Sequence, residues 1–392
     1  MTDRGALILD SGTGYIKIGH ATDTFPTSTY PALVGRPILR TSTKYKDIDI
    51  QPIMVGHEAA KARQFLDLNY PMSSGIISNW EDQNHVWKYG FDLLKVQPEK
   101  SRILVTEPVN NPTKIREEIC QNIFETHNFD KFQIQIQALL SAFGEGCMST
   151  TVLDSGDGVT HVIPILNGYV MTPLIKRINL AGRYITEHLS KLLFLRGYAF
   201  NTSADFETVR EIKERCCFVS HDVEVDRKLS QETTAYEMEY TLPDGSLINI
   251  GRERFEASEV LFNPQIAGLE MDGMASLVFN AIREGDATAR GDLFKHILLS
   301  GGTTMFPGFS TRMKVEMDNY YRSYLKKNAD EELNIDIQIL DSPNRKYNVF
   351  FGGCLFANSN LDVNNLWITK KIYEEKGAAR VMREEGMCFS KR

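Results

Sequence analysis

The stretch ALILDSGTGYIKIGH, residues 6–20, contains the pattern that decides the fold. An apolar run ends in Asp10, a Ser-Gly-x-Gly turn follows, and a second β-rich run leads away from the turn. Glycines permit such a tight turn, and the turn directs backbone N–H groups outward. We therefore predict a β-hairpin here whose turn can hold an anion.

A second copy of this pattern, TVLDSGDGVTHVIPI, occupies residues 151–165. The two copies share D-S-G-x-G, which indicates a duplicated half-molecule. A third glycine turn follows an apolar run in HILLSGGTTMFPGF, residues 296–309. One glycine turn is weak evidence because most such turns only change the chain's direction. Three of them supply enough N–H and hydroxyl groups to surround a polyphosphate.

Amphipathic helices are predicted between and after the hairpins. Apolar residues recur at helical spacing in residues 111–127, 182–196 and 204–218. In the last of these, Arg210, Lys213 and Glu214 share one flank. Two polar segments, residues 36–53 and 322–334, are expected to be exposed. Strands that alternate with such helices are typical of an α/β architecture.

Length and composition favour a two-lobed globular protein. The 392 residues exceed what one core usually serves, and hydrophobic and charged residues make up 42% and 24%. The net charge of −7 disfavours nucleic-acid binding. We expect no signal peptide, no membrane insertion, and free thiols because the six cysteines form no C-x-x-C pair.

The aspartates that lead the first two turns are candidate metal ligands. Asp10 and Asp154 stand at strand ends, where carboxylates can hold a hydrated Mg²⁺ that bridges nucleotide phosphates. Lys17, on the returning strand, is either a cation for phosphate or a surface lysine on an edge strand. Gln137 and His161 could orient an attacking water, although each of these residue types, taken alone, is more often a hydrogen-bonded structural residue.

Paired Asp-Ser-Gly turns also occur in aspartic proteases, where two carboxylates share one proton. Those enzymes are largely β and mostly secreted. The several long amphipathic helices of this chain and the expected absence of a signal peptide argue against that interpretation.

The whole chain resembles the actin family. The resemblance is carried by LILDSGTGYIKIG, TEPVNNPTKIRE, VLDSGDGVTH, NLAGRYITEHL, SADFETVREIKE, LLSGGTTMFPGF, NRKYNVFFGG and ITKKIYEEKG. LDLNYPMSSGII and YTLPDGSLINIGRERFEA are closer to an actin-related branch than to conventional actin. The resemblance implies the two-lobed fold of actin, hexokinase and Hsp70-like ATPases, with duplicated βββαβα halves and a central nucleotide cleft.

The resemblance also implies domains and site residues. The first lobe would comprise 1–139, with 36–67 as a peripheral subdomain, completed by 347–392; the second would comprise 140–346, with about 181–270 as its peripheral subdomain. Asp10 and Asp154 would hold Mg²⁺ through water, and Gln137, Asp154 and His161 would organise the hydrolytic water. The residues that would bind ATP or ADP are Ser11, Gly12, Thr13, Gly14, Lys17, Gly156, Asp157, Gly158, Val159, Arg210, Lys213, Glu214, Gly301, Gly302, Thr303, Thr304, Met305, Phe306 and Lys346.

The implied function is that of an actin-subunit mimic at the base of a daughter filament, within a complex that nucleates branched actin filaments. The implied partners are actin, a second actin-related protein, other subunits of the complex and nucleation-promoting factors, in the cytoplasm at the actin-rich cortex and cell projections. ATPase activity would be slow and would act as a conformational switch. Alternatives are a filament-forming or chromatin-associated actin relative, or a small-molecule kinase of the same superfamily.

Two further expectations come from the resemblance. An apolar groove for partner helices would be lined by Phe143, Gly144 and Gly146, with Met387 and Phe389 near the tail. Departures from the family are Tyr184, where an acidic residue is common, and Ser74, where conventional actin has histidine. Residues 36–53 lack the subunit-binding loop of conventional actin, which argues against symmetric self-polymerisation.

Overall fold

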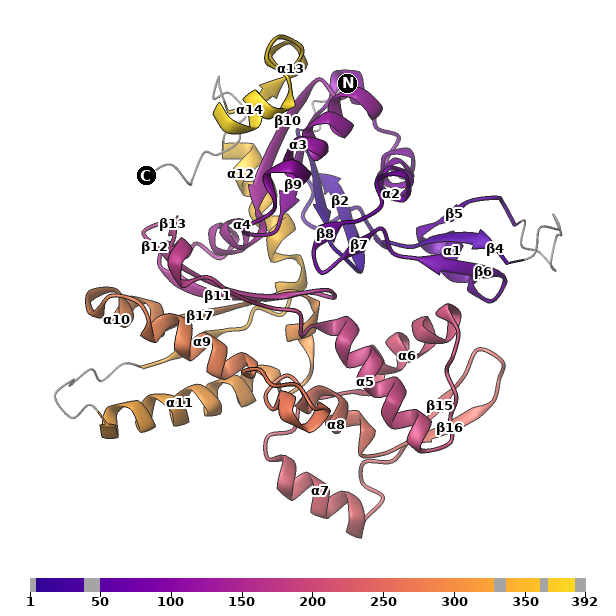
Figure 1. Ribbon diagram of the computed structural model, residues 1–392, viewed down its shortest axis with the longest axis vertical. Helices are drawn as coiled ribbons and strands as arrows, with labels where there is room; N and C mark the ends of the chain where they lie inside the picture. The colour runs from indigo at the N-terminus through magenta and orange to yellow at the C-terminus, as the bar shows by residue number, and fades with distance from the viewer. Residues whose placement is uncertain (1–4, 39–49, 328–335, 360–365, 385–392) are drawn as a thin grey trace. The chain divides into compact units, whose positions relative to one another are not determined.

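The computed structural model describes residues 5–38, 50–327, 336–359 and 366–384 (Figure 1). The chain forms two compact units. The first contains Met1–Ser149, Ile165–Val170 and Lys346–Arg392, and the second contains Thr150–Pro164 and Met171–Arg345.

The first unit is built on a sheet with the strand order β19-β10-β9-β1-β2-β3. Its strands are β1 (Leu7–Ser11), β2 (Tyr15–His20), β3 (Ser28–Pro31), β9 (Arg102–Glu107), β10 (Lys131–Ile136) and β19 (Ile368–Thr369). The strands β1, β2 and β3 are antiparallel neighbours, whereas β1, β9 and β10 run parallel. The first predicted hairpin is confirmed as β1 and β2.

The second unit repeats this order. Its strands are β11 (Thr150–Ser155), β12 (Thr160–Leu166), β14 (Lys176–Ile178), β17 (His296–Ser300) and β18 (Gln338–Leu340), and β13 (Tyr169–Val170) pairs with the last residues of β12. The order β14-β12-β11-β17-β18 matches β3-β2-β1-β9-β10, with β11, β17 and β18 parallel. The duplication inferred from two short motifs therefore extends to five strands in each unit.

Helices cover both faces of the first sheet. They are α2 (Trp80–Leu93), α3 (Thr113–Gln121), α4 (Gln137–Gly144), α12 (Asn348–Ser359), α13 (Lys370–Lys376) and α14 (Ala378–Glu384). Leu7 and Leu9 of β1 pack with α2 and α3, whereas Ile8, between them, packs with α4 and α12. This division follows from the alternation of side chains along a strand. The predicted helix over 111–127 is split, because α3 passes into a π-helical turn, Asn122–Thr126.

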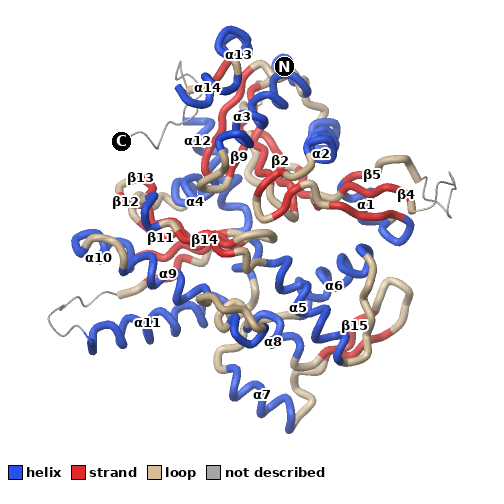
Figure 2. The backbone as a smooth tube through the Cα atoms, viewed as in Figure 1, coloured by secondary structure: helices blue, strands red, loops and turns tan. Residues whose placement is uncertain are grey.

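The helices of the second unit are α5 (Gly182–Leu195), α6 (Ser203–Cys216), α7 (Val223–Glu232), α8 (Glu253–Glu259), α9 (Met274–Arg283), α10 (Ala287–Lys295) and α11 (Phe309–Lys327). Helices α9 and α10 pack on β11 and α11 packs on β18, as the alternation of strands and helices along the chain predicts (Figure 2). A two-stranded sheet of β15 (Met238–Thr241) and β16 (Leu247–Ile250) lies beyond α7 in the sequence. The helices predicted over 182–196 and 204–218 are confirmed as α5 and α6, and α6 begins with a capping box of Thr202 and Asp205.

The first unit also contains a small sheet, which an ion pair links to helix α2. The sheet consists of β4 (Val34–Pro37), β5 (Met54–Val55) and β6 (Leu66–Asn69), with α1 (Gly56–Lys61) beside it. Arg36, expected in an exposed polar segment, lies in β4; its side chain is 43% exposed and donates to the buried carboxylate of Asp82 at 2.6 Å. Residues 39–49 of that segment, and 328–334 of the second one, lie outside the described residues.

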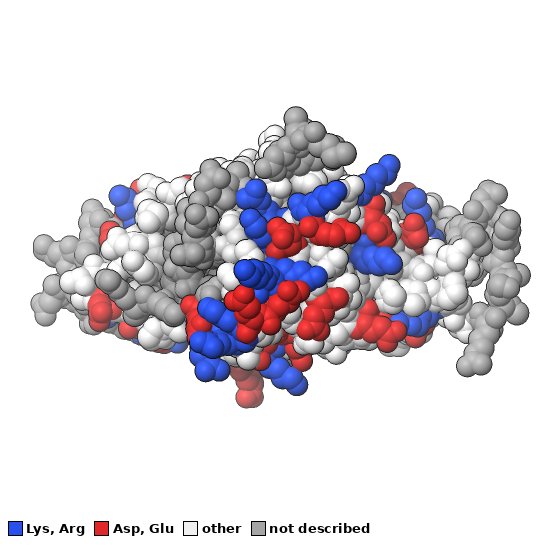
Figure 3. Space-filling model, turned by 90° about the horizontal axis from the view of Figure 1, so that it is seen from above, with Lys and Arg blue, Asp and Glu red and all other residues white. Residues whose placement is uncertain are grey.

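The surface and the cysteines agree with the composition. On the face drawn in Figure 3, basic side chains are interleaved with acidic ones. Within the described part of the chain, no helix is both long and apolar enough to span a bilayer. The five described cysteines are free thiols, and Cys388 lies outside the described residues.

Candidate functional site

The first hairpin surrounds the Asp10 carboxylate with hydrogen-bond donors. Asp10 is 2% exposed, and the strand register places Lys17 beside it in β2. Lys17 Nζ lies 2.7 Å from Asp10 Oδ2. Thr106 Oγ1 and Gln137 Nε2 donate to Oδ1 at 2.8 and 3.3 Å. The structure therefore brings three residues proposed from the sequence, Asp10, Lys17 and Gln137, into one network. It also corrects one alternative, because β2 lies between β1 and β3 and Lys17 is not on an edge strand.

Two hydroxyl groups of the first turn point into the protein. The Ser11 hydroxyl accepts from Trp87 Nε1 at 3.1 Å and from Gln83 Nε2 at 3.3 Å. The Thr13 hydroxyl accepts from the backbone N–H of Gly75 at 3.1 Å. Both side chains thus hold the turn in place, and the groups that the turn can offer to a ligand are those of its backbone.

The two Asp-led turns close in the same way. The Gly12 N–H donates to the Tyr15 carbonyl at 3.1 Å, and the Gly156 N–H donates to the Val159 carbonyl, also at 3.1 Å. Asp154 is the next-to-last residue of β11, as Asp10 is of β1, but it is only half-buried. The repeated sequence therefore folds into a repeated backbone turn.

The third glycine turn packs directly on the second. Gly301 has φ of 88°, and a Cβ there would lie 2.2 Å from the Ser155 carbonyl oxygen and 3.0 Å from Asp154 Oδ1. Only glycine fits this position. Thr303 donates its hydroxyl hydrogen to the Gly156 carbonyl at 2.6 Å. The sequence-predicted residues of both turns are thus brought together within the second unit.

The second turn also caps helix α5. The backbone N–H groups of Gly182 and Arg183 donate to the carbonyls of Gly156 and Asp157 at 3.1 and 2.8 Å. These N–H groups belong to the first turn of the helix, which has no partners of its own for them. The Arg183 side chain adds an ion pair to the Asp157 carboxylate at 3.1 Å. Four hydrogen bonds therefore join Gly156 and Asp157 of the turn to Gly182 and Arg183 of the helix, two from backbone N–H groups and two from the Arg183 guanidinium.

Helix α6 presents a charged cluster toward the start of α5. Arg210 pairs with the buried Glu207 at 2.8 Å and with Glu214 at 3.0 Å. Lys213 donates to the carbonyl of Gly182 at 2.9 Å. Burial lowers the pKa of the Lys213 ammonium below its ordinary value. The flank predicted from the sequence is therefore formed, with Lys213 linked through Gly182 to the second turn.

His161 is buried in β12 without a partner for one ring nitrogen. It is 3% exposed, and no described residue makes a hydrogen bond to its Nε2. Burial, assisted by the positive charge of Arg177, lowers its pKa to about 4. At neutral pH the imidazole is therefore uncharged, and an orphaned nitrogen of this kind calls for an unseen partner such as water.

The remaining predicted residues are distributed as follows. Gly302 to Met305 form a 3-10 turn that Phe306, 9% exposed, follows. The Thr304 hydroxyl donates to the Gly301 carbonyl and accepts a hydrogen bond from Nε of the buried Arg345 at 3.1 Å. Lys346 is exposed and lies 4.8 Å over the ring of Tyr347.

Three of the five residues expected to line an apolar groove are among the described residues. Phe143 is 43% exposed, and Gly144 lies against α12, where a Cβ would meet the Gly352 nitrogen at 3.1 Å. Gly146 has a positive φ of 70°. Met387 and Phe389 lie outside the described residues. The departures Ser74 and Tyr184 are both half-buried, and burial raises the pKa of Tyr184.

Each unit, considered by itself, carries a turn and an aspartate whose chemistry fits phosphate oxygens and a hydrated Mg²⁺. In the two turns, no described residue accepts from the backbone N–H groups of Thr13, Gly14, Asp157 and Gly158. Such N–H groups in a glycine turn bind anions. Within its own unit, each turn-leading aspartate supplies carboxylate oxygens, the kind of ligand that Mg²⁺ prefers beside waters and phosphates. Among the described residues, no three His, Cys, Asp or Glu side chains form a metal-binding set of their own.

Sequence reasoning missed Thr106, Gly182 and Arg183 as parts of the site. Thr106 ends the run ILVT of residues 103–106, which has the same form as ILLS at 297–300. That shared form was a signal, since parallel strands end at the same sheet edge. The contact of Gly182 and Arg183 with the second turn had no such signal, because it depends on tertiary packing alone.

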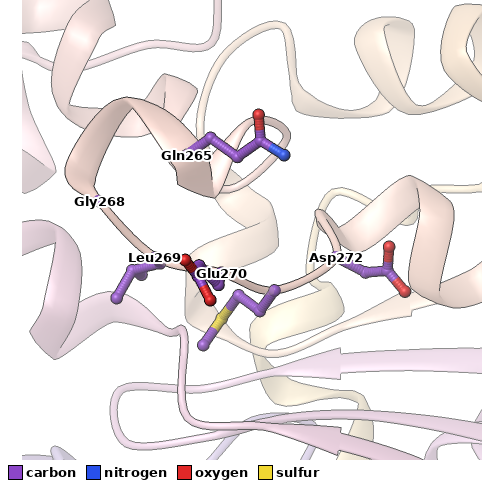
Figure 4. A pocket seen from close by; sticks show the side chains of 6 residues that line it. Gln265, Gly268, Leu269, Glu270 and Asp272 are labelled. Atoms are coloured by element: carbon purple, nitrogen blue, oxygen red, sulfur yellow. The ribbon is translucent and has the colours of Figure 1, made fainter.

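One cavity of about 740 Å³ lies at the loop that precedes α9. Gln265, Gly268, Leu269, Glu270, Met271 and Asp272 line it, and Figure 4 shows the carboxylates of Glu270 and Asp272 near this loop. None of the residues proposed from the sequence is among them.

Comparison with known proteins gives a consistent result. The family model named Actin matches residues 1–385. The chain is 45% identical to actin-related protein 2 of Acanthamoeba castellanii, with 99% of this chain and 100% of the relative covered. The same protein of Arabidopsis thaliana is 45% identical, with coverage of 96% and 97%. That of Drosophila melanogaster is 44% identical, with coverage of 95% and 96%.

Proposed function

The chain belongs to the actin family, and on this basis we propose that it is an ATP-binding, actin-related subunit of the complex that nucleates branched actin filaments. The observation that carries the proposal is 44% to 45% identity, over nearly the whole chain, to three proteins named actin-related protein 2. In this role the chain mimics an actin subunit at the base of a daughter filament. Its partners are actin, a second actin-related protein, the other subunits of the complex and nucleation-promoting factors.

Bound Mg-ATP would supply the γ-phosphate whose presence or loss switches the chain between states. The proposed ligands are the free backbone N–H groups of the two turns, with Lys17 as a point charge and Asp10 and Asp154 facing the hydrated metal ion. Two observations support this set: the four unpartnered N–H groups, and a carboxylate placed directly before each turn. The cytoplasmic cortex and cell projections are the proposed location.

Gln137 and His161 are the proposed residues for orienting water. Gln137 uses its amide nitrogen on Asp10, which leaves its carbonyl oxygen as an acceptor. The uncharged His161 has one buried nitrogen without a described partner. The Gln137 amide is not basic, and the His161 imidazole, with a pKa of about 4, is only weakly basic, so each can bind a water without removing its proton. Hydrolysis of this kind is slow and suits a switch rather than a metabolic enzyme.

The proposal is tested first by its partners. The tagged full-length chain is expressed at its natural level and purified, and the associated proteins are identified by mass spectrometry. We expect a second actin-related protein and further subunits in fixed proportion. Purification of the chain alone, or only with itself, contradicts the proposed role.

The nucleotide is tested on the same preparation. Asp154→Ala removes one carboxylate that faces the metal ion, so Mg-ATP affinity measured by calorimetry should fall at least about tenfold. The matched control is Asp292→Ala, which removes an exposed carboxylate from α10 of the same unit and should leave the affinity unchanged. Equal affinities of the two variants would exclude Asp154 from the site.

A further inference from the structure

Thr106 links two of the proposed site residues through its side chain. It stands next to last in β9, and the register of β1 and β9 aligns it with Asp10. It is 3% exposed, so its hydroxyl group has little access to bulk solvent. Thr106 Oγ1 lies 2.8 Å from Asp10 Oδ1 and 3.2 Å from Gln137 Nε2. The hydroxyl group therefore stands between the carboxylate and the amide.

The direction of these hydrogen bonds follows from the chemistry of the groups. An ionised carboxylate only accepts, so the hydroxyl of Thr106 must donate its hydrogen to Asp10. The lone pairs of that hydroxyl then accept from the Gln137 amide nitrogen. The same amide nitrogen also donates to Asp10 Oδ1 at 3.3 Å. The two acceptor oxygens lie only 2.8 Å apart, so one N–H of the Gln137 amide is shared between them.

A rotation of the Gln137 amide by 180° would reverse this arrangement. It would set the amide oxygen against the Asp10 carboxylate and against a hydroxyl whose hydrogen is already donated. Two acceptor atoms in contact repel each other, and a buried polar group that is left without a hydrogen bond destabilises that arrangement. The network therefore selects one of the two amide orientations, in which the oxygen faces away from Asp10 and Thr106.

We propose that Thr106 is a positioning residue that locks the Gln137 amide so that its carbonyl oxygen, not its NH₂ group, is presented to the hydrolytic water. This inference rests on the proposed function, because the water matters only if nucleotide is hydrolysed. The backbone at Gln137 is already fixed as the first residue of α4, so the amide orientation is the freedom that Thr106 removes. Positioning of this kind acts on the rate of hydrolysis and not on nucleotide binding.

The test uses Thr106→Val, Thr106→Ser, Gln137→Ala and the double variant Thr106→Val/Gln137→Ala in the full-length chain. Valine keeps the shape of threonine without the hydroxyl, and serine keeps the hydroxyl. We expect Thr106→Val to lower single-turnover ATP hydrolysis about tenfold or more while Mg-ATP affinity stays within about twofold. Thr106→Ser should restore the rate to within about twofold of wild type. In the Gln137→Ala background, Thr106→Val should have no further effect.

Two results would overturn the inference. One is a wild-type hydrolysis rate in Thr106→Val. The other is an equal loss of rate from Thr106→Val with and without Gln137, because the hydroxyl would then act through Asp10 alone.

A second measurement does not depend on turnover. Nitrogen-15 labelling of glutamine side chains reports the exchange of the Gln137 NH₂ hydrogens with water, assigned by their loss in Gln137→Ala. Exchange should be at least about tenfold faster in Thr106→Val than in wild type or Thr106→Ser. Equal exchange in all three would refute the lock. A wild-type chain that binds no Mg-ATP would instead refute the proposed function, whatever the exchange rates show.

Discussion

The hairpin led by Asp10 and the hairpin led by Asp154 have the same backbone turn, but their buried side chains differ. Seven residues after each aspartate, at matched places on the returning strand, the first has Lys17 and the second has His161. Lys17 forms an ion pair with Asp10 at 2.7 Å, whereas His161 is kept uncharged with a nitrogen that no described residue contacts. The first hairpin therefore carries a charged Lys17–Asp10 pair, whereas the second carries an uncharged His161 imidazole at the matched position.

The neighbours of the two hairpins account for this difference. The residue opposite Lys17 on β3 is Thr29, which carries no charge, whereas the residue opposite His161 on β14 is Arg177. A cation beside the histidine disfavours its protonation, and burial acts in the same direction. At matched positions of the two sheets, the neighbouring strand therefore differs: β3 leaves Lys17 charged beside Asp10, and β14 places a cation that keeps His161 uncharged.

The largest effect should come from removing the cation of the first hairpin. Lys17→Met leaves the buried Asp10 carboxylate without its counterion, and we expect a loss of about 3 kcal/mol in the free energy of unfolding without nucleotide. His161→Gln, at the matched position, breaks no ion pair and should cost less than about 1 kcal/mol. Urea unfolding followed by circular dichroism measures both values. Equal losses would show that the two positions are energetically alike and would break the comparison.

A smaller effect should appear as a pH dependence. His161 has a pKa of about 4 in the folded chain against 6.5 ordinarily, so between these values only the unfolded chain binds the proton. Stability from this histidine is complete above pH 6.5 and falls as the pH is lowered toward 4, by about 2 kcal/mol between pH 7.5 and pH 5.

The histidine contribution can be isolated by substitution. His161→Gln should lose about 2 kcal/mol less than wild type over that pH interval. His127 in the first unit, also with a pKa of about 4, would continue to contribute in this variant. The exposed His221 provides the control substitution, His221→Gln. Parallel pH profiles for wild type and His161→Gln would refute the assigned protonation state.

The smallest predicted effect is a difference in stability between alanine substitutions of the first glycine in each turn. At Gly12 an added Cβ would lie 2.8 Å from the Tyr15 carbonyl oxygen, whereas at Gly156 the nearest atom is the Val159 oxygen at 3.9 Å. We expect Gly12→Ala to destabilise the chain by about 1 kcal/mol and Gly156→Ala by less than about 0.5 kcal/mol. Differential scanning calorimetry of the two variants decides the order, and a greater loss for Gly156→Ala would contradict it.

The sequence was sufficient for the parts of the fold that depend on local pattern. Both hairpins, the third glycine turn and the helices α5 and α6 follow from glycine positions and apolar spacing, which act over a few residues. The π-helical turn that follows α3 was not predicted, because periodicity alone does not distinguish it from a continuing α-helix. The ion pair of Arg36 was not predicted, because its partner Asp82 lies 46 residues away.

For the candidate site, residue types were easier to predict than side-chain directions. The motif predicted Ser11 as a nucleotide-binding residue. Its hydroxyl instead accepts a hydrogen bond from Trp87, 76 positions away in the sequence. Thr106 was missed for the same reason, since its importance depends on the parallel pairing of β1 and β9. Single-sequence patterns identify which strand ends carry polar groups, but only tertiary packing determines where those groups point.

Helix α5 has no cap from its own flanking side chains; carbonyl groups of the second turn serve instead. A helix of 14 residues is a stiff rod of about 21 Å. A small tilt of Gly156 and Asp157 would therefore be transmitted along this rod and would be largest at its far end, near Leu195. If the second turn binds phosphate as proposed, its position at the start of α5 makes it the pivot of that helix.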